Sequence, residues 1–118
     1  MKNAVLGLAI FAVCTAAHAK DFSASQKSKL QAAVKEHLID SDSAKFKLPE
    51  YKGGDIYCGQ VNAKNRMGGY TGYTVFQVAV LPGTSSGFYV LGVGSGDLND
   101  PTSSALIQAC GEKGYAFR

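Results

Sequence analysis

Two strand-forming segments flank a glycine-rich polar turn in residues 56–76, which read IYCGQVNAKNRMGGYTGYTVF. In the first segment the apolar residues change parity between Cys58 and Val61. Because alternate side chains of a strand point to opposite faces, a bulge at Gly59 would restore a single apolar face. We therefore predict a bulged strand over residues 56–65, followed by a turn, with these side chains facing inward: Ile56, Cys58, Val61 and Ala63.

Further strands are predicted on both sides of this segment. Residues 71–81 continue the sheet after the turn, and residues 88–93 follow a glycine- and serine-rich loop. Residues 44–48 form a short edge strand, because Pro49 has no N–H group to donate to a central strand. Short connections rich in glycine favour antiparallel pairing. The sequence thus predicts an antiparallel sheet of three or four strands.

Helices are predicted at both ends of this sheet. Residues 20–40 have apolar side chains at helical spacing, and Ser23 with Gln26 forms a capping box. The polar residues 40–43 then end the helix in a turn. Asp100 followed by Pro101 is typical of a helix start, and this second helix extends to about Cys110. The predicted fold class is α+β, with the C-terminal helix packed on the sheet.

The first nineteen residues have the three parts of a secretory signal peptide: a basic start, a short apolar segment and an Ala-x-Ala end. We expect cleavage between Ala19 and Lys20, which would leave residues 20–118 as one small α+β domain. Cys14 offers an alternative as a lipidation site, although Val13 is a poor residue immediately before a lipidated cysteine. Both interpretations place the protein in the periplasm or outside the cell, with no transmembrane span in the mature chain.

Removal of the leader would leave two of the three cysteines, Cys58 and Cys110. Two cysteines in an exported chain favour a disulfide, since the compartment is oxidising. This bond would clamp the C-terminal helix to the first strand of the 56–76 segment. A loop of this length predicts a stabilisation of about 4 kcal/mol in chain-entropy terms.

The densest group of polar side chains without an evident structural task lies in residues 62–73. Asparagine is disfavoured in strands, and tyrosine supplies contact area at low entropic cost. We expect an exposed binding surface for a protein or glycan partner, formed by Asn62, Lys64, Asn65, Arg66, Tyr70 and Tyr73. The alternative is structural: Asn62 and Asn65 bond the backbone across the turn, and Lys64 only solvates the sheet.

Other function classes find little support in the sequence. His37 is the only histidine after the leader, and we interpret it as a partly buried structural residue rather than a catalytic base. Residues 97–100 lack the ligand number and spacing of a calcium loop, so no metal or other cofactor is predicted. A formal net charge of +3 without a basic stripe argues against nucleic-acid binding. We therefore expect a protein without enzymatic activity.

Three blocks of the sequence resemble a family of small exported bacterial proteins and lipoproteins that has no assigned function. The blocks are residues 40–46 (DSDSAKF), 58–65 (CGQVNAKN) and 68–73 (GGYTGY). Ser41 stands where the family pattern has proline, which affects only the stiffness of that turn. The resemblance covers the central third of the chain. It implies that the chain belongs to a family of exported proteins, and it implies no particular chemical activity.

Three functional hypotheses follow from these observations, of which a small hydrolase is the least favoured. The first is an exported binding module, of the inhibitor or immunity type, that uses the surface at residues 62–73. The second is an envelope-associated structural protein, held near anionic polymer by a basic helix face formed by Lys27, Lys29 and Lys35. Replacing these three lysines would distinguish the first two.

Overall fold

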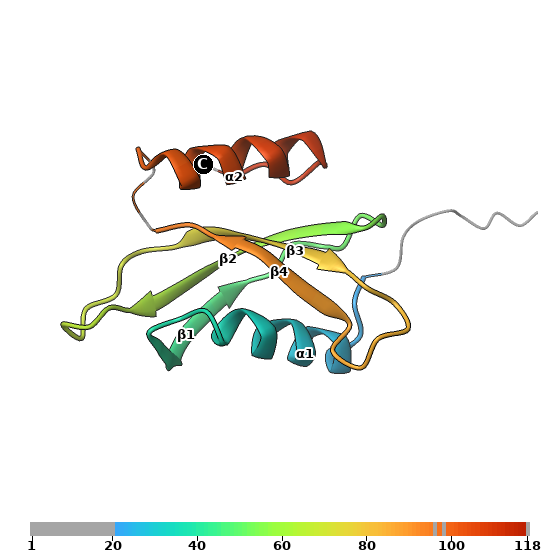
Figure 1. Ribbon diagram of the computed structural model, residues 1–118, viewed down its shortest axis with the longest axis horizontal. Helices are drawn as coiled ribbons and strands as arrows, with labels where there is room; N and C mark the ends of the chain where they lie inside the picture. Colours follow the sequence, from blue (N-terminus) through green and yellow to red (C-terminus); the bar gives the residue numbers. More distant parts are fainter. Residues whose placement is uncertain (1–20, 96, 98, 118) are drawn as a thin grey trace, which may run out of the picture.

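The computed structural model describes residues 21–95, 97 and 99–117. A four-stranded antiparallel sheet forms its middle layer, with the strands in the order β1-β2-β3-β4. Helices α1 and α2 lie on opposite faces of this sheet (Figure 1). The elements in chain order are α1 (Ala24–Lys35), β1 (Asp40–Lys47), β2 (Ile56–Lys64), β3 (Thr74–Val80), β4 (Phe88–Val93) and α2 (Pro101–Glu112). The predicted α+β class is confirmed. The predicted cleavage between Ala19 and Lys20, and Cys14, lie outside the described residues.

Helix α1 begins where the capping box predicted it. The hydroxyl of Ser23 accepts a hydrogen bond from the Gln26 N–H (3.1 Å), and the Gln26 side chain accepts one from the Ser23 N–H (2.8 Å). The predicted length was wrong, since α1 ends at Lys35 rather than near residue 40. After the helix, the N–H groups of His37 and Leu38 donate hydrogen bonds to the carbonyls of Val34 and Lys35, three residues earlier, and the chain then enters β1.

Residues 40–43 were predicted to form a turn, but they belong to β1. The β1–β2 register shifts between Asp40 and Lys45, and Ser43 lies within this irregularity. The Ser43 hydroxyl donates to the Asp40 carbonyl (2.8 Å) and accepts from the Lys64 N–H (2.9 Å). A side chain thus replaces a backbone partner, which lets short polar residues lie in a strand.

The bulge predicted at Gly59 is absent from the β2–β3 pairing, whose register is continuous from Ile56 opposite Ala79 to Val61 opposite Thr74. The apolar residues change parity for a different reason: helices cover both faces of the sheet. Cys58 faces α2, while Val61 faces α1, and both are buried. A Cβ at Gly59 would lie 2.6 Å from the Phe76 ring, so this glycine lets the aromatic ring approach the strand closely.

Helix α2 is fixed to the sheet by its cap and by a disulfide. The Asp100 carboxylate accepts a hydrogen bond from the Ser103 N–H (3.0 Å), and Pro101 is the first helical residue. The predicted Cys58–Cys110 disulfide is present and joins α2 to β2. The helix extends to Glu112, two residues beyond the predicted end, and Gly114 follows with a φ of 93°.

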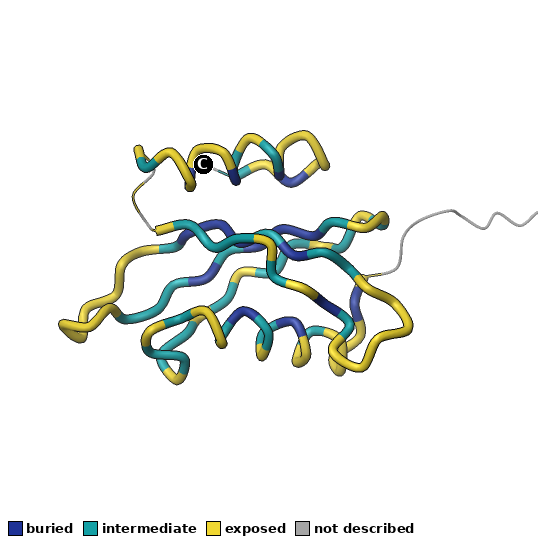
Figure 2. Tube along the Cα trace, in the orientation of Figure 1, coloured by how far each residue is buried: buried dark blue, intermediate teal, exposed yellow. Residues whose placement is uncertain are grey.

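The hydrophobic core includes buried residues of the sheet and of both helices (Figure 2). Leu30 and Val34 of α1 are completely buried. An aromatic cluster extends this core, with Phe22 against Tyr51, Tyr57 and Phe88 at centroid distances of 4.3 to 5.2 Å. Within the described part of the chain, no helix is both long enough and apolar enough to cross a membrane.

Candidate functional site

The two asparagines of the predicted binding block fix the backbone of the loop that joins β2 to β3. The Asn65 side-chain oxygen accepts hydrogen bonds from the N–H groups of Met67 (2.9 Å) and Gly69 (3.2 Å). The Asn62 side-chain oxygen accepts one from the Gly72 N–H (3.0 Å). These bonds match the structural alternative that we considered for Asn62 and Asn65. They also explain why β3 begins at Thr74 and not at residue 71.

Tyr70 lies across β1 and β2 and is held at both ends. Its hydroxyl donates a hydrogen bond to the Ser43 carbonyl (3.0 Å). The Lys45 ammonium nitrogen lies 4.5 Å from the centroid of the Tyr70 ring, and that of Lys64 lies 5.6 Å from it. Both distances are typical of cation–π contacts. The exposed Tyr70 ring therefore gathers two cations that belong to different strands.

Tyr73 makes an equivalent contact with Lys47, which lies two residues after Lys45 on the edge strand β1. The Lys47 ammonium nitrogen lies 4.1 Å from the centroid of the Tyr73 ring. Lys45 is paired with Asn62, and Lys47 with Gln60, so both lysines point to the face of the sheet that carries α2. We call the surface formed by these side chains the lysine–tyrosine face: Lys45, Lys47, Lys64, Tyr70 and Tyr73.

The lysine–tyrosine face remains open to solvent because α2 covers only the β3–β4 part of the sheet face that they share. Helix α2 packs on β3 and β4 and is bonded to β2, while β1 lies beyond it. Lys45 and Lys47 are exposed. Among the described residues, no carboxylate lies within 4.0 Å of the ammonium groups of this face, although Asp40 is the register partner of Lys64. The face thus has a positive charge that is not neutralised locally.

Sequence reasoning identified only part of this surface. It included Lys64, Tyr70 and Tyr73, but it left out Lys45 and Lys47, which belong to the predicted edge strand. The sequence shows that Lys45 and Lys47 lie on the same side of the strand. Their contact with the tyrosines, however, depends on the β1–β2 register, which the sequence does not specify. Arg66 is exposed at the tip of the turn, apart from the cation–π contacts.

A pocket of about 220 Å³ lies at the same end of the sheet. Among the residues of the lysine–tyrosine face, it is lined by Lys64 alone. Thr74 is one of the lining residues, and its hydroxyl is buried with no hydrogen-bond partner among the described atoms. His37 also lines this pocket and is exposed, so the prediction of a partly buried histidine was wrong. The reason is that α1 ends before His37, which removes this residue from the inner helix face.

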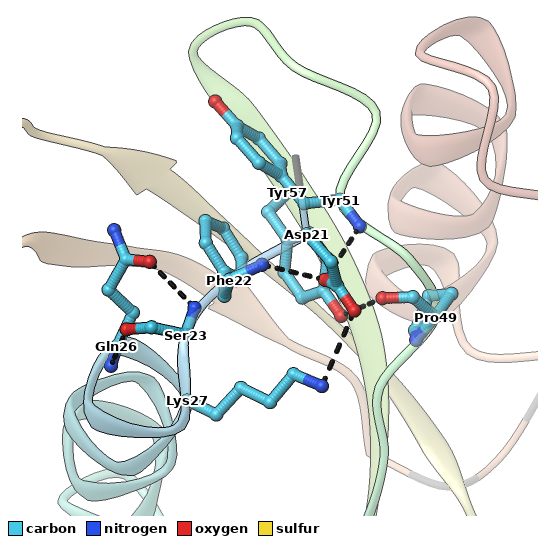
Figure 3. A network of polar contacts seen from close by, with 8 residues as sticks. All are labelled: Asp21, Phe22, Ser23, Gln26, Lys27, Pro49, Tyr51 and Tyr57. Atoms are coloured by element: carbon cyan, nitrogen blue, oxygen red, sulfur yellow. Dashed lines mark hydrogen bonds and ion pairs between the residues drawn. The ribbon is translucent and has the colours of Figure 1, made fainter. Parts of the chain in front are cut away.

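A second polar network surrounds Asp21 at the start of α1 (Figure 3). The Asp21 carboxylate accepts hydrogen bonds from the N–H groups of Phe22 (2.8 Å) and Tyr51 (3.1 Å), and it lies 3.4 Å from the Lys27 ammonium. The hydrogen bond from the Tyr51 N–H is the largest cause that lowers the pKa of this carboxyl. Burial raises the pKa in part, and Phe22 and Lys27 lower it further. Lys27 therefore has an acidic partner, in contrast to the lysines on β1 and β2.

Comparison with known proteins leaves the site to be interpreted from its own geometry. No protein-family model, no curated protein and no solved structure matches this chain. The resemblance to small exported bacterial proteins therefore stays a prediction from the sequence.

Proposed function

We propose that this chain is an exported, non-catalytic binding module of the inhibitor or immunity type, and that its lysine–tyrosine face contacts an acidic protein outside the cytoplasm. One observation carries this proposal: three lysines converge on two tyrosine rings, with no carboxylate of the described chain within 4.0 Å of their ammonium groups. A solvated strand edge needs no such convergence.

The geometry of the face suits a charged macromolecular partner. Each tyrosine ring restrains a flexible lysine side chain, which reduces the conformational entropy lost on binding. The ammonium groups keep N–H donors available for carboxylates of a partner. Because lysines already cover the Tyr70 and Tyr73 rings, these rings are less suited to stacking against a sugar. We therefore favour an acidic protein surface over a glycan.

Two further features support a role outside the cytoplasm. The Cys58–Cys110 disulfide joins α2 to the sheet, and such structural disulfides form and persist in oxidising compartments. The N-terminal nineteen residues have the composition of a secretory leader. Together they support export, followed by folding in the periplasm or outside the cell.

Affinity capture from a native envelope and culture-medium extract tests this proposal. The bait is the folded chain, compared with a variant that carries Lys45→Gln, Lys47→Gln and Lys64→Gln. We expect wild type to retain an acidic protein that the variant loses, with circular dichroism showing that both are folded. Equal retention by the two baits would contradict the proposal, and retention of an anionic glycan alone would replace the protein partner.

The competing hypothesis, an envelope protein held by the basic face of α1, predicts a different pattern. It requires Lys27, Lys29 and Lys35, of which Lys27 is already paired with Asp21. A variant with all three changed to glutamine would lose envelope retention under that hypothesis. We expect it to retain the partner as wild type does, because α1 lies on the other side of the sheet (Figure 1).

A further inference from the structure

The two edge strands of the sheet differ in how well they are protected against pairing. Strand β1 carries Lys45 and Lys47 and a register shift, which are features that discourage the addition of another strand. Strand β4 reads FYVLGV and contains neither charge nor proline. Its Tyr89 is 63% exposed and its Leu91 is 48% exposed. An uncharged, exposed edge is a template for another strand.

The outer backbone edge of β4 is regular over residues 88–90, where the Phe88 carbonyl accepts one long hydrogen bond from the Ser86 hydroxyl (3.3 Å) that a partner strand would replace or share. Leu91 is an extra residue, because Val90 pairs with Val78 while Gly92 pairs with the neighbouring Gln77. The Leu81 N–H donates to the Gly87 carbonyl (2.8 Å). Since hydrogen-bonded pairs alternate along an antiparallel ladder, the backbone groups of Phe88 and Val90 then point away from β3.

We propose that a second copy of this chain pairs with β4, forming a two-fold symmetric dimer with a continuous eight-stranded sheet. With the axis at Tyr89, Phe88 of each copy lies opposite Val90 of the other. Each such pair exchanges two backbone hydrogen bonds. The pairing is self-complementary, as an isologous interface requires.

Both helices leave room beside β4 for this second copy. A groove of about 400 Å³ is lined by residues of α1 and β4, and a groove of about 450 Å³ is lined by residues of α2 and β4. The α1 side is lined by Ala32 and Ala33, and the α2 side by Ala105 and Ala109. Small side chains at these positions let a neighbouring chain approach both faces of the joined sheet.

Charge complementarity favours a second copy as the occupant. Lys29 of α1 and Glu36, which caps the C-terminal end of this helix, both line the β4 groove. A two-fold axis perpendicular to the sheet makes the two α1 helices antiparallel and places them on the same side of it. Lys29 of one copy then faces the helix end that carries Glu36 of the other. Opposite charges therefore face each other on both sides of the two-fold axis.

Sedimentation equilibrium of the folded, disulfide-bonded chain tests this dimer from micromolar to millimolar concentration. We expect wild type to dimerise, and Lys29→Glu or Glu36→Lys alone to raise the dimer Kd by at least about tenfold, because like charges then face each other. The double variant Lys29→Glu/Glu36→Lys restores dimerisation. Lys113→Glu, an equal charge change away from β4, leaves the Kd within about twofold of wild type.

Tyr89→Lys provides a second, independent test, because it places like charges together on the proposed axis. We expect it to abolish the dimer while the circular dichroism spectrum stays that of wild type. A wild type that stays monomeric up to millimolar concentration would overturn the proposal. So would a dimer that tolerates both single charge reversals and Tyr89→Lys, since the copies would then meet elsewhere.

Discussion

Asn65 and Lys64 are neighbours in the chain, yet their side chains have different tasks. The Asn65 oxygen accepts two backbone N–H groups within the turn, while the Lys64 ammonium lies near the Tyr70 ring. Composition alone groups these residues into one polar block. The structure separates an amide scaffold, which shapes the loop, from a cationic surface, which is available to a partner.

Loss of the Asn65 side chain is expected to weaken the fold. Asn65→Ala leaves the N–H groups of Met67 and Gly69 without their protein acceptor, so we expect the free energy of unfolding to fall by about 1–2 kcal/mol. Arg66→Ala, in the same turn, is the matched control and changes it by less than about 0.5 kcal/mol. Urea denaturation monitored by circular dichroism measures both, and equal effects would contradict the scaffold role.

Asp21 makes stability depend on pH in the acid range. Its pKa is lower in the folded state than its usual value of 3.8, chiefly because of the Tyr51 N–H. Its stabilisation is therefore complete above pH 3.8 and is lost as the pH falls through the lower folded-state pKa. We expect Asp21→Ala to be less stable than wild type at pH 7 and the difference to shrink as the pH falls below 3.8. A difference that grows with acidity would contradict this sign.

At the scale of elements, helix starts and strand existence follow from the sequence, while the details of pairing do not. The capping box at Ser23 and the Asp100–Pro101 start are local signals, and the structure confirms both. Errors arose where tertiary contacts decide. Helix α2 covers the face of β2 that carries Cys58, so the change of apolar parity in β2 requires no bulge at Gly59. The Ser43 hydroxyl accepts a hydrogen bond from the Lys64 N–H, which allows residues predicted to form a turn to belong to a strand.

Gly59 is expected to tolerate no side chain, although it is not the bulge that the sequence predicted. In Gly59→Ala the new Cβ would meet the buried Phe76 ring, so we expect a loss of about 1–3 kcal/mol in the free energy of unfolding. Gly69→Ala has open space around its Cβ and serves as the control. Chemical denaturation of both variants checks this expectation, which fails if the two substitutions are equally mild.

At the scale of the whole molecule, the two proposals use opposite edges of the sheet. The lysine–tyrosine face lies along β1 and β2, whereas the proposed dimer forms at β4. The sequence alone suggested Lys64, Tyr70 and Tyr73, because unusual polar and aromatic residues cluster in 62–73. It could not suggest their partners on β1, since cross-strand contacts depend on a register that local patterns do not specify.

Binding of an acidic protein by the lysine–tyrosine face is tested by titration of the captured partner at increasing NaCl concentration. For the variant Lys45→Gln/Lys47→Gln/Lys64→Gln, we predict an affinity at least about tenfold below wild type and a weaker dependence on salt. A control with Lys27, Lys35 and Lys113 changed to glutamine leaves Lys29 intact and should bind within about twofold of wild type. Equal losses in the two variants, or none in either, would contradict binding by this face.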